Sequence, residues 1–200
     1  MKSGQLGISN IFILAVLSAA PAVSQGRVLG HGAARRFVSE KYGFSMAVPV
    51  GWGVSTTLNT PVFFYAPSSE RFVQDAIPQG GAVITTEPHD TASRLSKSAT
   101  TPDAWALADA RSFASEIPPI EPFLLPSESG AAHAVICSYD EVVFSSDQHI
   151  HHSVAIFWEF DHQLFAAHLN YNANDPHGPI FEKVFLQTVR NVRPLQKHSP

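Results

Sequence analysis

Residues 131–170 read AAHAVICSYD EVVFSSDQHI HHSVAIFWEF DHQLFAAHLN. Three runs rich in apolar and β-branched residues are separated there by two short polar breaks with the composition of turns. The runs predict strands at 131–144, 149–160 and 164–170. Such short connections join neighbouring antiparallel strands, so this part of the chain predicts an antiparallel meander.

Two helices are predicted beside this meander. Thr101 is suited to an N-cap and Pro102 to the first helical position, and apolar residues recur at helical spacing over 104–116 before two prolines end the run. Phe and Val recur at the same spacing over 180–192. Each pattern is typical of an amphipathic helix with one face against a core.

Further strands are predicted before the first helix. Apolar residues alternate over 44–48 and again over 52–56, with Pro49 and Gly51 between them, which predicts a hairpin. Runs at 62–65 and 81–86 predict two more strands of one sheet. The order of strands, helix, strands and helix favours an α+β fold, an antiparallel β-sheet with flanking helices.

The N-terminus has the features of an export signal. Lys2 supplies a positive charge, residues 8–20 are mostly apolar, and small residues precede the two candidate cleavage sites, after Ala22 or after Ser24. The predicted organisation is a signal peptide at 1–24, a tether at 25–41, a single domain at 42–194 and a tail at 195–200. The mature protein is expected to be exported, either periplasmic or secreted, with no transmembrane segment.

Composition excludes several classes of protein. Charged residues make up 15% of the chain and apolar residues 44%, which argues against disorder and against nucleic-acid binding through a basic surface. Removing residues 1–24 takes away one of 13 Lys and Arg and none of 17 Asp and Glu, leaving a formal net charge of −5. The single cysteine, Cys137, lies in an apolar run and is expected to be buried.

The stretch Tyr42–Trp52, YGFSMAVPVGW, resembles the opening hairpin of the PsbP-like superfamily, which includes the extrinsic photosystem subunit and exported proteins of the DcrB and LpqN types. In that pattern an aromatic residue precedes a short strand, and a Pro-x-Gly-Trp turn follows it. The element order over 42–192 is also similar. The resemblance implies a PsbP-like α/β/α sandwich and a non-enzymatic domain that binds or stabilises larger assemblies. It carries no catalytic residue over to this chain.

Histidine is the unusual residue type, with seven of ten histidines between residues 133 and 177. On a strand, His149 and His151 point to one face about 6–7 Å apart, and His152 points to the other. His133 or His168 on a neighbouring strand would supply a third ligand, giving a zinc or copper site. The alternative is a solvated strand end, and no Cys pair or His-Glu-x-x-His pattern adds support for a metal.

The histidines also predict a pH-dependent charge. Protonation of all ten changes the formal charge of the mature chain from −5 to +5. Signals for catalysis are weak, because the sequence has neither a Gly-x-Ser-x-Gly elbow nor a Gly-rich phosphate loop.

Aromatic residues suggest where a partner protein would bind. The runs 63–65 and 157–158 supply large apolar side chains to both faces of a strand. Helices on both sides would bury them, whereas an uncovered face would form an apolar partner surface. The sequence thus predicts an exported binding protein with an unknown protein partner, and a histidine-rich metal-binding protein as the alternative.

Overall fold

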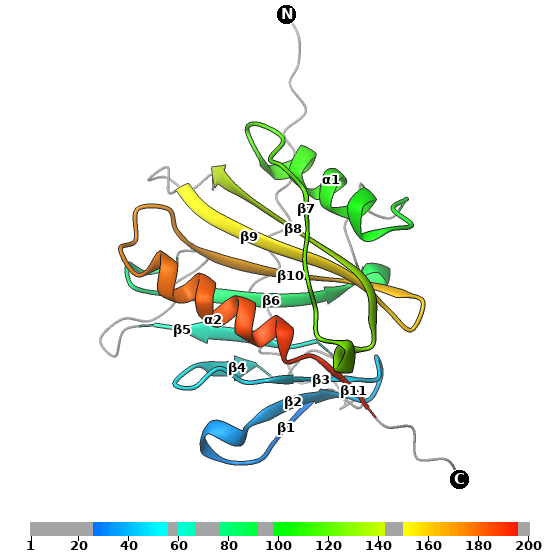
Figure 1. The fold of residues 1–200 in the computed structure, drawn as a ribbon. Helices are drawn as coiled ribbons and strands as arrows, with labels where there is room; N and C mark the ends of the chain where they lie inside the picture. The colour runs from blue at the N-terminus through cyan, green and yellow to red at the C-terminus, as the bar shows by residue number, and fades with distance from the viewer. Residues whose placement is uncertain (1–25, 56–59, 67–76, 92–97, 143–149, 196–200) are drawn as a thin grey trace, which may run out of the picture.

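The computed structural model describes residues 26–55, 60–66, 77–91, 98–142 and 150–195. Within these ranges, two antiparallel sheets pack with two α-helices in an α+β fold (Figure 1). The large sheet has the order β4-β5-β6-β10-β9-β8-β7. Its strands are β4 (Gly53–Ser55), β5 (Val62–Tyr65), β6 (Ala82–Pro88), β7 (Glu121–Pro122), β8 (Ala131–Val142), β9 (Ile150–Phe160) and β10 (Gln163–Asn172).

The small sheet has the order β1-β2-β3-β11. Its strands are β1 (Arg27–Leu29), β2 (Arg36–Ser39), β3 (Phe44–Ala47) and β11 (Arg193–Pro194). Three 3₁₀ turns, η1 (Gly32–Ala34), η2 (His89–Thr91) and η3 (Ser127–Ser129), lie between elements. The strands of the small sheet therefore come from both ends of the described chain.

The predicted meander is confirmed by β8, β9 and β10, which pair in sequence order. Asp161 and His162 both have positive φ, 49° and 61°, as a tight two-residue turn between twisted strands requires. β5 and β6 lie in one sheet, as expected, and they pair with each other.

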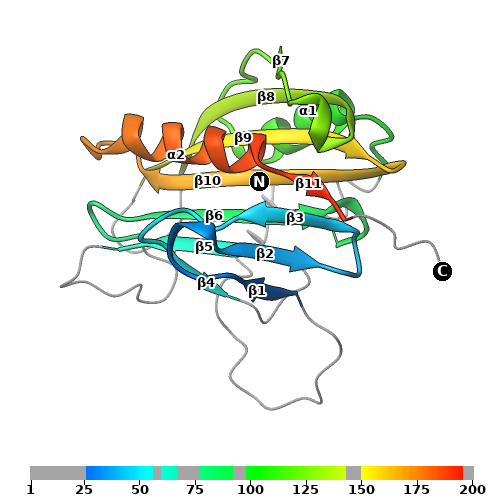
Figure 2. The same cartoon turned by 60° about the horizontal axis from the view of Figure 1, so that its bottom comes forward.

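Both predicted helices are present, α1 (Pro102–Phe113) and α2 (Gly178–Arg190). The Thr101 hydroxyl accepts a hydrogen bond from the Ala104 backbone N–H at 3.2 Å, so it is the N-cap that the sequence indicated. Figures 1 and 2 show the two helices against opposite sides of the large sheet.

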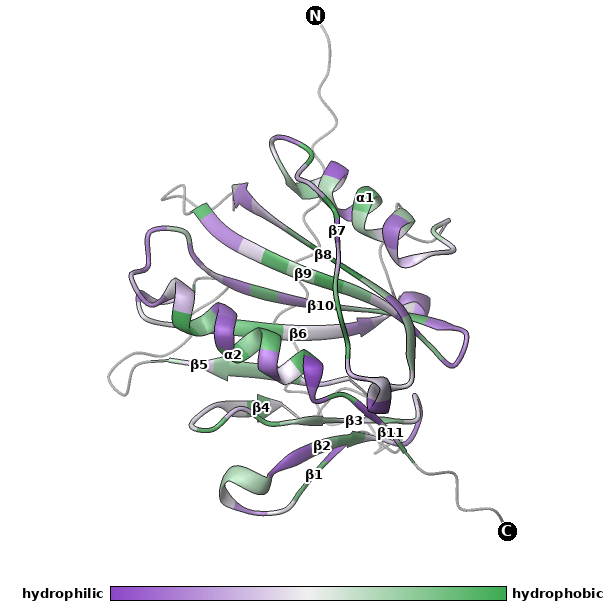
Figure 3. Ribbon diagram, in the orientation of Figure 1, coloured by the Kyte–Doolittle hydropathy of each residue, from purple (hydrophilic) through white to green (hydrophobic). Residues whose placement is uncertain are grey.

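Alternation along the strands divides the core between the two sides of the large sheet. On the α1 face, Trp105 of the helix packs on Phe157 and Ala155 of β9. On the α2 face, Phe181 and Phe185 of the helix share a larger core with the small sheet. The hydropathy colouring in Figure 3 follows this pattern, with hydrophobic residues along the central strands.

The predicted hairpin at 44–48 and 52–56 is wrong. β3 pairs with β2 and β11 in the small sheet, whereas β4 pairs with β5 in the large sheet. The turn at Pro49–Gly51 therefore passes the chain from one sheet to the other. Trp52, only 5% exposed, packs against Tyr65 and Phe181 on the α2 face of the large sheet.

Residues 27–39 form β1 and β2 rather than a tether. β2 pairs along its whole length with β3, and the side chain of Phe37 is fully buried. The folded domain thus begins before Tyr42. Within the described ranges, no helix is both long and apolar enough to span a membrane.

Candidate functional site

The structure places three of the four candidate metal ligands on the α1 face. His168 lies opposite Ala155 of β9, and His151 lies four positions from Ala155 along that strand. His133, on β8, lies opposite Glu159, four positions from Ala155 in the other direction. Four residues of strand span about 13 Å, so one ion cannot reach all three imidazoles.

These histidines have separate surroundings. His133 Nε2 lies 2.7 Å from Asp103 Oδ2 at the start of α1, and His151 is 7% exposed beside the end of the sheet. Among the residues that the structure describes, no three His, Cys, Asp or Glu side chains are arranged to hold a metal. His149 lies outside the described residues, so a site that pairs it with His151 stays a prediction.

A polar cluster lies between α1 and the large sheet, here called the α1 cluster: Asp109, Tyr139, His168, Glu87 and Glu141. Tyr139 Oη donates a hydrogen bond of 2.6 Å to Asp109 Oδ2. His168 has its Nδ1 3.9 Å from Asp109 Oδ2 and its Nε2 3.8 Å from Glu87 Oε1. These two separations exceed hydrogen-bond length, so His168 lies close to both carboxylates without a direct hydrogen bond to either.

Burial controls the electrostatics of the α1 cluster. It raises the pKa of Glu87, an effect that the nearby His168 partly offsets, and it raises the pKa of Glu141, with the Asp109 carboxylate adding to it. The pKa of Tyr139 is raised in the same way by burial and by Asp109. Burial therefore favours the neutral forms of Glu87, Glu141 and Tyr139.

Two buried nitrogens near this cluster, Trp105 Nε1 and His168 Nε2, have no hydrogen-bond partner among the described residues. Phe157 separates them, with ring centroids 5.5 Å from Trp105 and 5.6 Å from His168. Ordered water is the usual partner of such buried groups.

Cys137 is poorly suited to be a nucleophile. It is 3% exposed, and burial together with the Asp109 carboxylate raises the pKa of its thiol to about 12. The thiolate is the reactive form, so this cysteine is expected to stay unreactive at neutral pH.

A second cluster lies on the α2 face. His152 Nδ1 lies 2.7 Å from Asp140 Oδ1, and its Nε2 lies 4.0 Å from Glu182 Oε1. Tyr171 donates a hydrogen bond of 2.6 Å to the same Glu182 oxygen and packs against the His152 ring. These contacts connect α2 to β8, β9 and β10, and they stabilise the position of the helix on the sheet.

The predicted apolar partner surface on a sheet face is not present at these aromatic runs. Phe63, Phe157 and Trp158 are at most 1% exposed, because α1 covers one face and α2 with the small sheet covers the other. In these runs Phe64 is exposed, at 39%, and Tyr65 is partly buried.

Two of the exposed apolar side chains lie on the segment Ile117–Pro126, here called the arm, which pairs with the outer edge of β8 through β7. Leu124 is 84% exposed and Ile117 56% exposed. Phe123 between them is buried, with its backbone N–H bonded to Ala134 O at 2.9 Å and Arg190 over its ring. Figure 3 shows the hydrophobic colouring of the arm between β7 and η3.

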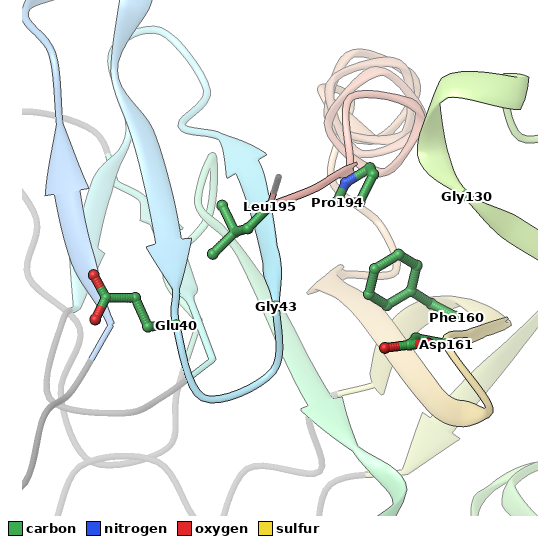
Figure 4. Close-up of a pocket in the computed structure, with 7 residues that line it drawn as sticks. All are labelled: Glu40, Gly43, Gly130, Phe160, Asp161, Pro194 and Leu195. Carbon is green, nitrogen blue, oxygen red and sulfur yellow. The ribbon is translucent and has the colours of Figure 1, made fainter. Parts of the chain in front are cut away.

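A pocket of about 490 Å³ opens near the foot of the arm, where the two sheets meet (Figure 4). It lies between the β2–β3 turn, the β9–β10 turn, the start of β8 and the end of β11. Its lining residues are Glu40, Gly43, Gly130, Phe160, Asp161, Pro194 and Leu195.

The sequence does indicate one member of the α1 cluster, Asp109, which the search for metal-binding histidines did not consider. Asp109 follows Trp105 by four residues, so both lie on one side of α1, and Asp109 thereby occupies a core-facing position. A carboxylate there needs a partner, and Tyr139 supplies it. The exposed arm, by contrast, had only its prolines as a signal.

No family model and no curated protein matches the chain. Among solved structures, one from Bacteroides thetaiotaomicron has 11% sequence identity and a TM-score of 0.47, covering 84% of this chain and 50% of its own. A protein of unknown function from Pseudomonas aeruginosa has 12% identity and a TM-score of 0.38, covering 80% of this chain and 94% of its own. This chain thus spans half the length of the first.

Proposed function

We propose that this protein is an exported, non-enzymatic PsbP-like domain that binds or stabilises a protein partner in the cell envelope or the extracellular space. The signal-like segment at 1–24 supports the compartment. The family is supported by the sequence pattern at Tyr42–Trp52 and by the order of strands, helix, strands and helix, although β3 and β4 lie in different sheets and do not form the hairpin of that pattern. The observation that carries the binding function is the arm, with Leu124 84% exposed at the edge of the large sheet.

The arm has the properties of a preorganised recognition element. Pro118, Pro119, Pro122 and Pro126 each fix one φ angle, which lowers the entropy that the segment loses on binding. Phe123 anchors it to the sheet and to α2 through the contacts described above. The arm therefore holds Ile117 and Leu124 in place without covering them.

Exposed leucine and isoleucine side chains on such a segment favour contact with another protein. Burying one large aliphatic side chain contributes about 1.5–3 kcal/mol, and two of them are presented on one arm. A partner surface with apolar pockets, spaced to receive both residues, fits this arrangement. The unreactive thiol of Cys137 is consistent with binding rather than covalent catalysis.

A photo-cross-linking amino acid placed at position 124 of the full chain, expressed in its native host, tests the proposal. We expect one discrete cross-linked species that disappears when Ile117→Ser is added. The matched control is the same amino acid at Val50, which is 73% exposed on the turn between the sheets. Identical products at both positions, or none at position 124, would show that the arm has no specific partner.

A further inference from the structure

Two arginines of the small sheet, Arg36 and Arg193, lie on the face that is turned away from the core. Register places Arg193 opposite Ser45 and Arg36 opposite Ala47, two residues further along β3, so both side chains share one face. Arg36 Nη2 donates a hydrogen bond of 3.0 Å to Ser45 Oγ, which agrees with this placement. The other face of β2 and β3 packs into the core, where Phe37 is fully buried.

Backbone carbonyls at the end of α2 hold the two guanidinium groups near each other. Arg36 Nη2 donates to Asn191 O at 2.8 Å. Arg193 Nη1 donates to Arg190 O at 2.9 Å and to Val192 O at 2.7 Å. These three carbonyls are consecutive along the chain, and Figure 2 shows β11 running from the end of α2 toward β3. Two positive charges are therefore anchored at one place on the surface.

Neither Arg36 nor Arg193 has a carboxylate partner among the described residues. Burial and the positive charge of Arg193 lower the pKa of the Arg36 guanidinium, and no described acidic group opposes them. Arg27 on the same face differs, because its guanidinium lies 2.7 Å from Glu40 Oε1. The dipole of α2 supplies about half a negative charge at its C-terminus, so about one and a half positive charges stay uncompensated.

Both guanidinium groups also keep donors that the protein does not use. Within the described ranges, Arg36 Nη1 and Arg193 Nη2 take part in no hydrogen bond, while the contacts above fix the orientation of both planar groups. Arginine binds the oxygens of phosphate and carboxylate groups through such paired donors. Because the side chains are already ordered, an anion that binds there costs little further side-chain entropy.

We infer that Arg36 and Arg193 form a binding site for a phosphate monoester group. Such a group carries roughly −1.5 to −2 charges at neutral pH and three acceptor oxygens, which match two guanidinium groups better than the single charge of a carboxylate does. No residue of the arm takes part, so the inference is independent of the proposed function.

Titration of the full chain with inorganic phosphate, followed by backbone amide chemical shifts, tests the inference. We expect the largest shifts at Ser45, Asn191 and Arg193, and weaker binding at high ionic strength. Acetate, a carboxylate probe with one charge, is expected to bind more weakly than phosphate. Absence of shifts at these three residues overturns the site.

Arg193→Gln is the matched variant, because it removes one guanidinium group without changing the backbone that pairs β11 with β3. We expect it to weaken phosphate binding about tenfold, the effect of losing one charge-assisted hydrogen bond. Arg193→Lys keeps the charge but loses the planar fork, and is expected to weaken binding less. The control is Arg111→Gln, at an exposed position in the last turn of α1, which should leave binding unchanged.

Equal phosphate binding by the wild type and Arg193→Gln overturns the site, as does an equal loss in Arg111→Gln, which would indicate unspecific attraction to positive charge. If Arg193→Gln does not fold, Arg193→Lys decides, and binding as tight as that of the wild type counts against the site.

Lipid vesicles distinguish two sources of the phosphate group. Sedimentation with phosphatidylcholine vesicles that contain phosphatidic acid, whose headgroup is a phosphate monoester, is compared with sedimentation with phosphatidylcholine alone. Binding only to the first, lost in Arg193→Gln, assigns a lipid headgroup to the site. Binding of inorganic phosphate without binding to either vesicle assigns a soluble phosphorylated compound.

Discussion

Tyr139 on β8 and Asp109 on α1 are joined by a 2.6 Å hydrogen bond between two buried side chains. The bond crosses from helix to sheet in the middle of the α1 face. It supplies a hydrogen-bond donor to a buried carboxylate that lies beside Cys137, with His168 Nδ1 3.9 Å away. The stability of the α1 packing therefore depends on this pair.

Tyr139→Phe should lower the free energy of unfolding by about 1–3 kcal/mol, because it leaves the buried Asp109 carboxylate without its donor. Urea denaturation at pH 7 measures the change. The exposed neighbour Ser138→Ala is the control and should have little effect. In an Asp109→Ala background, Tyr139→Phe should cost less than in the wild type, and strict additivity of the two changes would contradict a direct coupling.

The raised pKa values of Glu87 and Glu141 predict a pH dependence of known sign. The folded protein binds these two protons more tightly than the unfolded chain does. The two groups therefore make their full favourable contribution to the free energy of unfolding when the pH is below the ordinary pKa of 4.5. It is lost as pH rises through the raised values.

A double variant, Glu87→Gln with Glu141→Gln, should therefore be more stable than the wild type at pH 7. The difference should shrink as the pH falls to 4.5 and below, because both carboxyl groups then become protonated in the folded and in the unfolded state. Chemical denaturation across this pH range measures it, with the exposed Glu116→Gln as control. A double variant that is less stable than the wild type at pH 7 would mean that the charged carboxylates are favourable in the fold.

For Asp175 we predict a pH dependence of stability of the opposite sign. Burial raises the pKa of its fully buried side chain, but hydrogen bonds from the His177 backbone N–H, the Gly80 backbone N–H and the His177 ring outweigh this and lower it. With a folded-state pKa below the ordinary 3.8, its contribution is present above that value and lost as pH falls.

Asp175→Ala should lower the free energy of unfolding by about 2–4 kcal/mol at pH 7, since several charge-assisted hydrogen bonds are lost together. The adjacent exposed Asn174→Ala is the control. Urea midpoints at pH 7 and below pH 4 measure the effect, which should narrow in acid. If the difference between the wild-type and variant midpoints stays constant with pH, the charge of the Asp175 carboxylate does not account for the effect.

Chelator and added metal should leave the thermal melting temperature unchanged. His133, His151 and His168 lie too far apart to share one ion, so zinc or copper has no three-ligand site among the described residues to stabilise. Melting with EDTA and with excess zinc or copper measures this. Stabilisation by several degrees that His151→Asn abolishes would instead support a site that includes His149.

The fold was predictable where local chemistry decides it. Thr101 and Pro102 set the start of α1, and the Asp161–His162 turn joins β9 and β10. The small sheet was not predictable in the same way, because β1 and β2 lie in a stretch of Gly, Ala and charged residues with no clear period. β2 pairs with β3, and its Phe37 side chain is fully buried in the core on the α2 face.

The candidate sites show a similar limit. Alternation correctly predicted that His151 and His152 point to opposite faces of the sheet. Alternation gives no strand register, however, and register decides how far apart His133, His151 and His168 lie. The exposure of Leu124 depends on the path of the arm along β8, which is a tertiary property.

The pairing of β3 with β11 constrains when this protein can fold. Arg36 donates a 2.8 Å hydrogen bond to the carbonyl of Asn191, 155 residues later, and β11 supplies the edge of the sheet that β1–β3 begin. A chain that leaves a ribosome or a translocation channel N-terminus first cannot complete this sheet until its final strand has emerged. Such a topology makes release of the C-terminal segment a requirement for completing the small sheet.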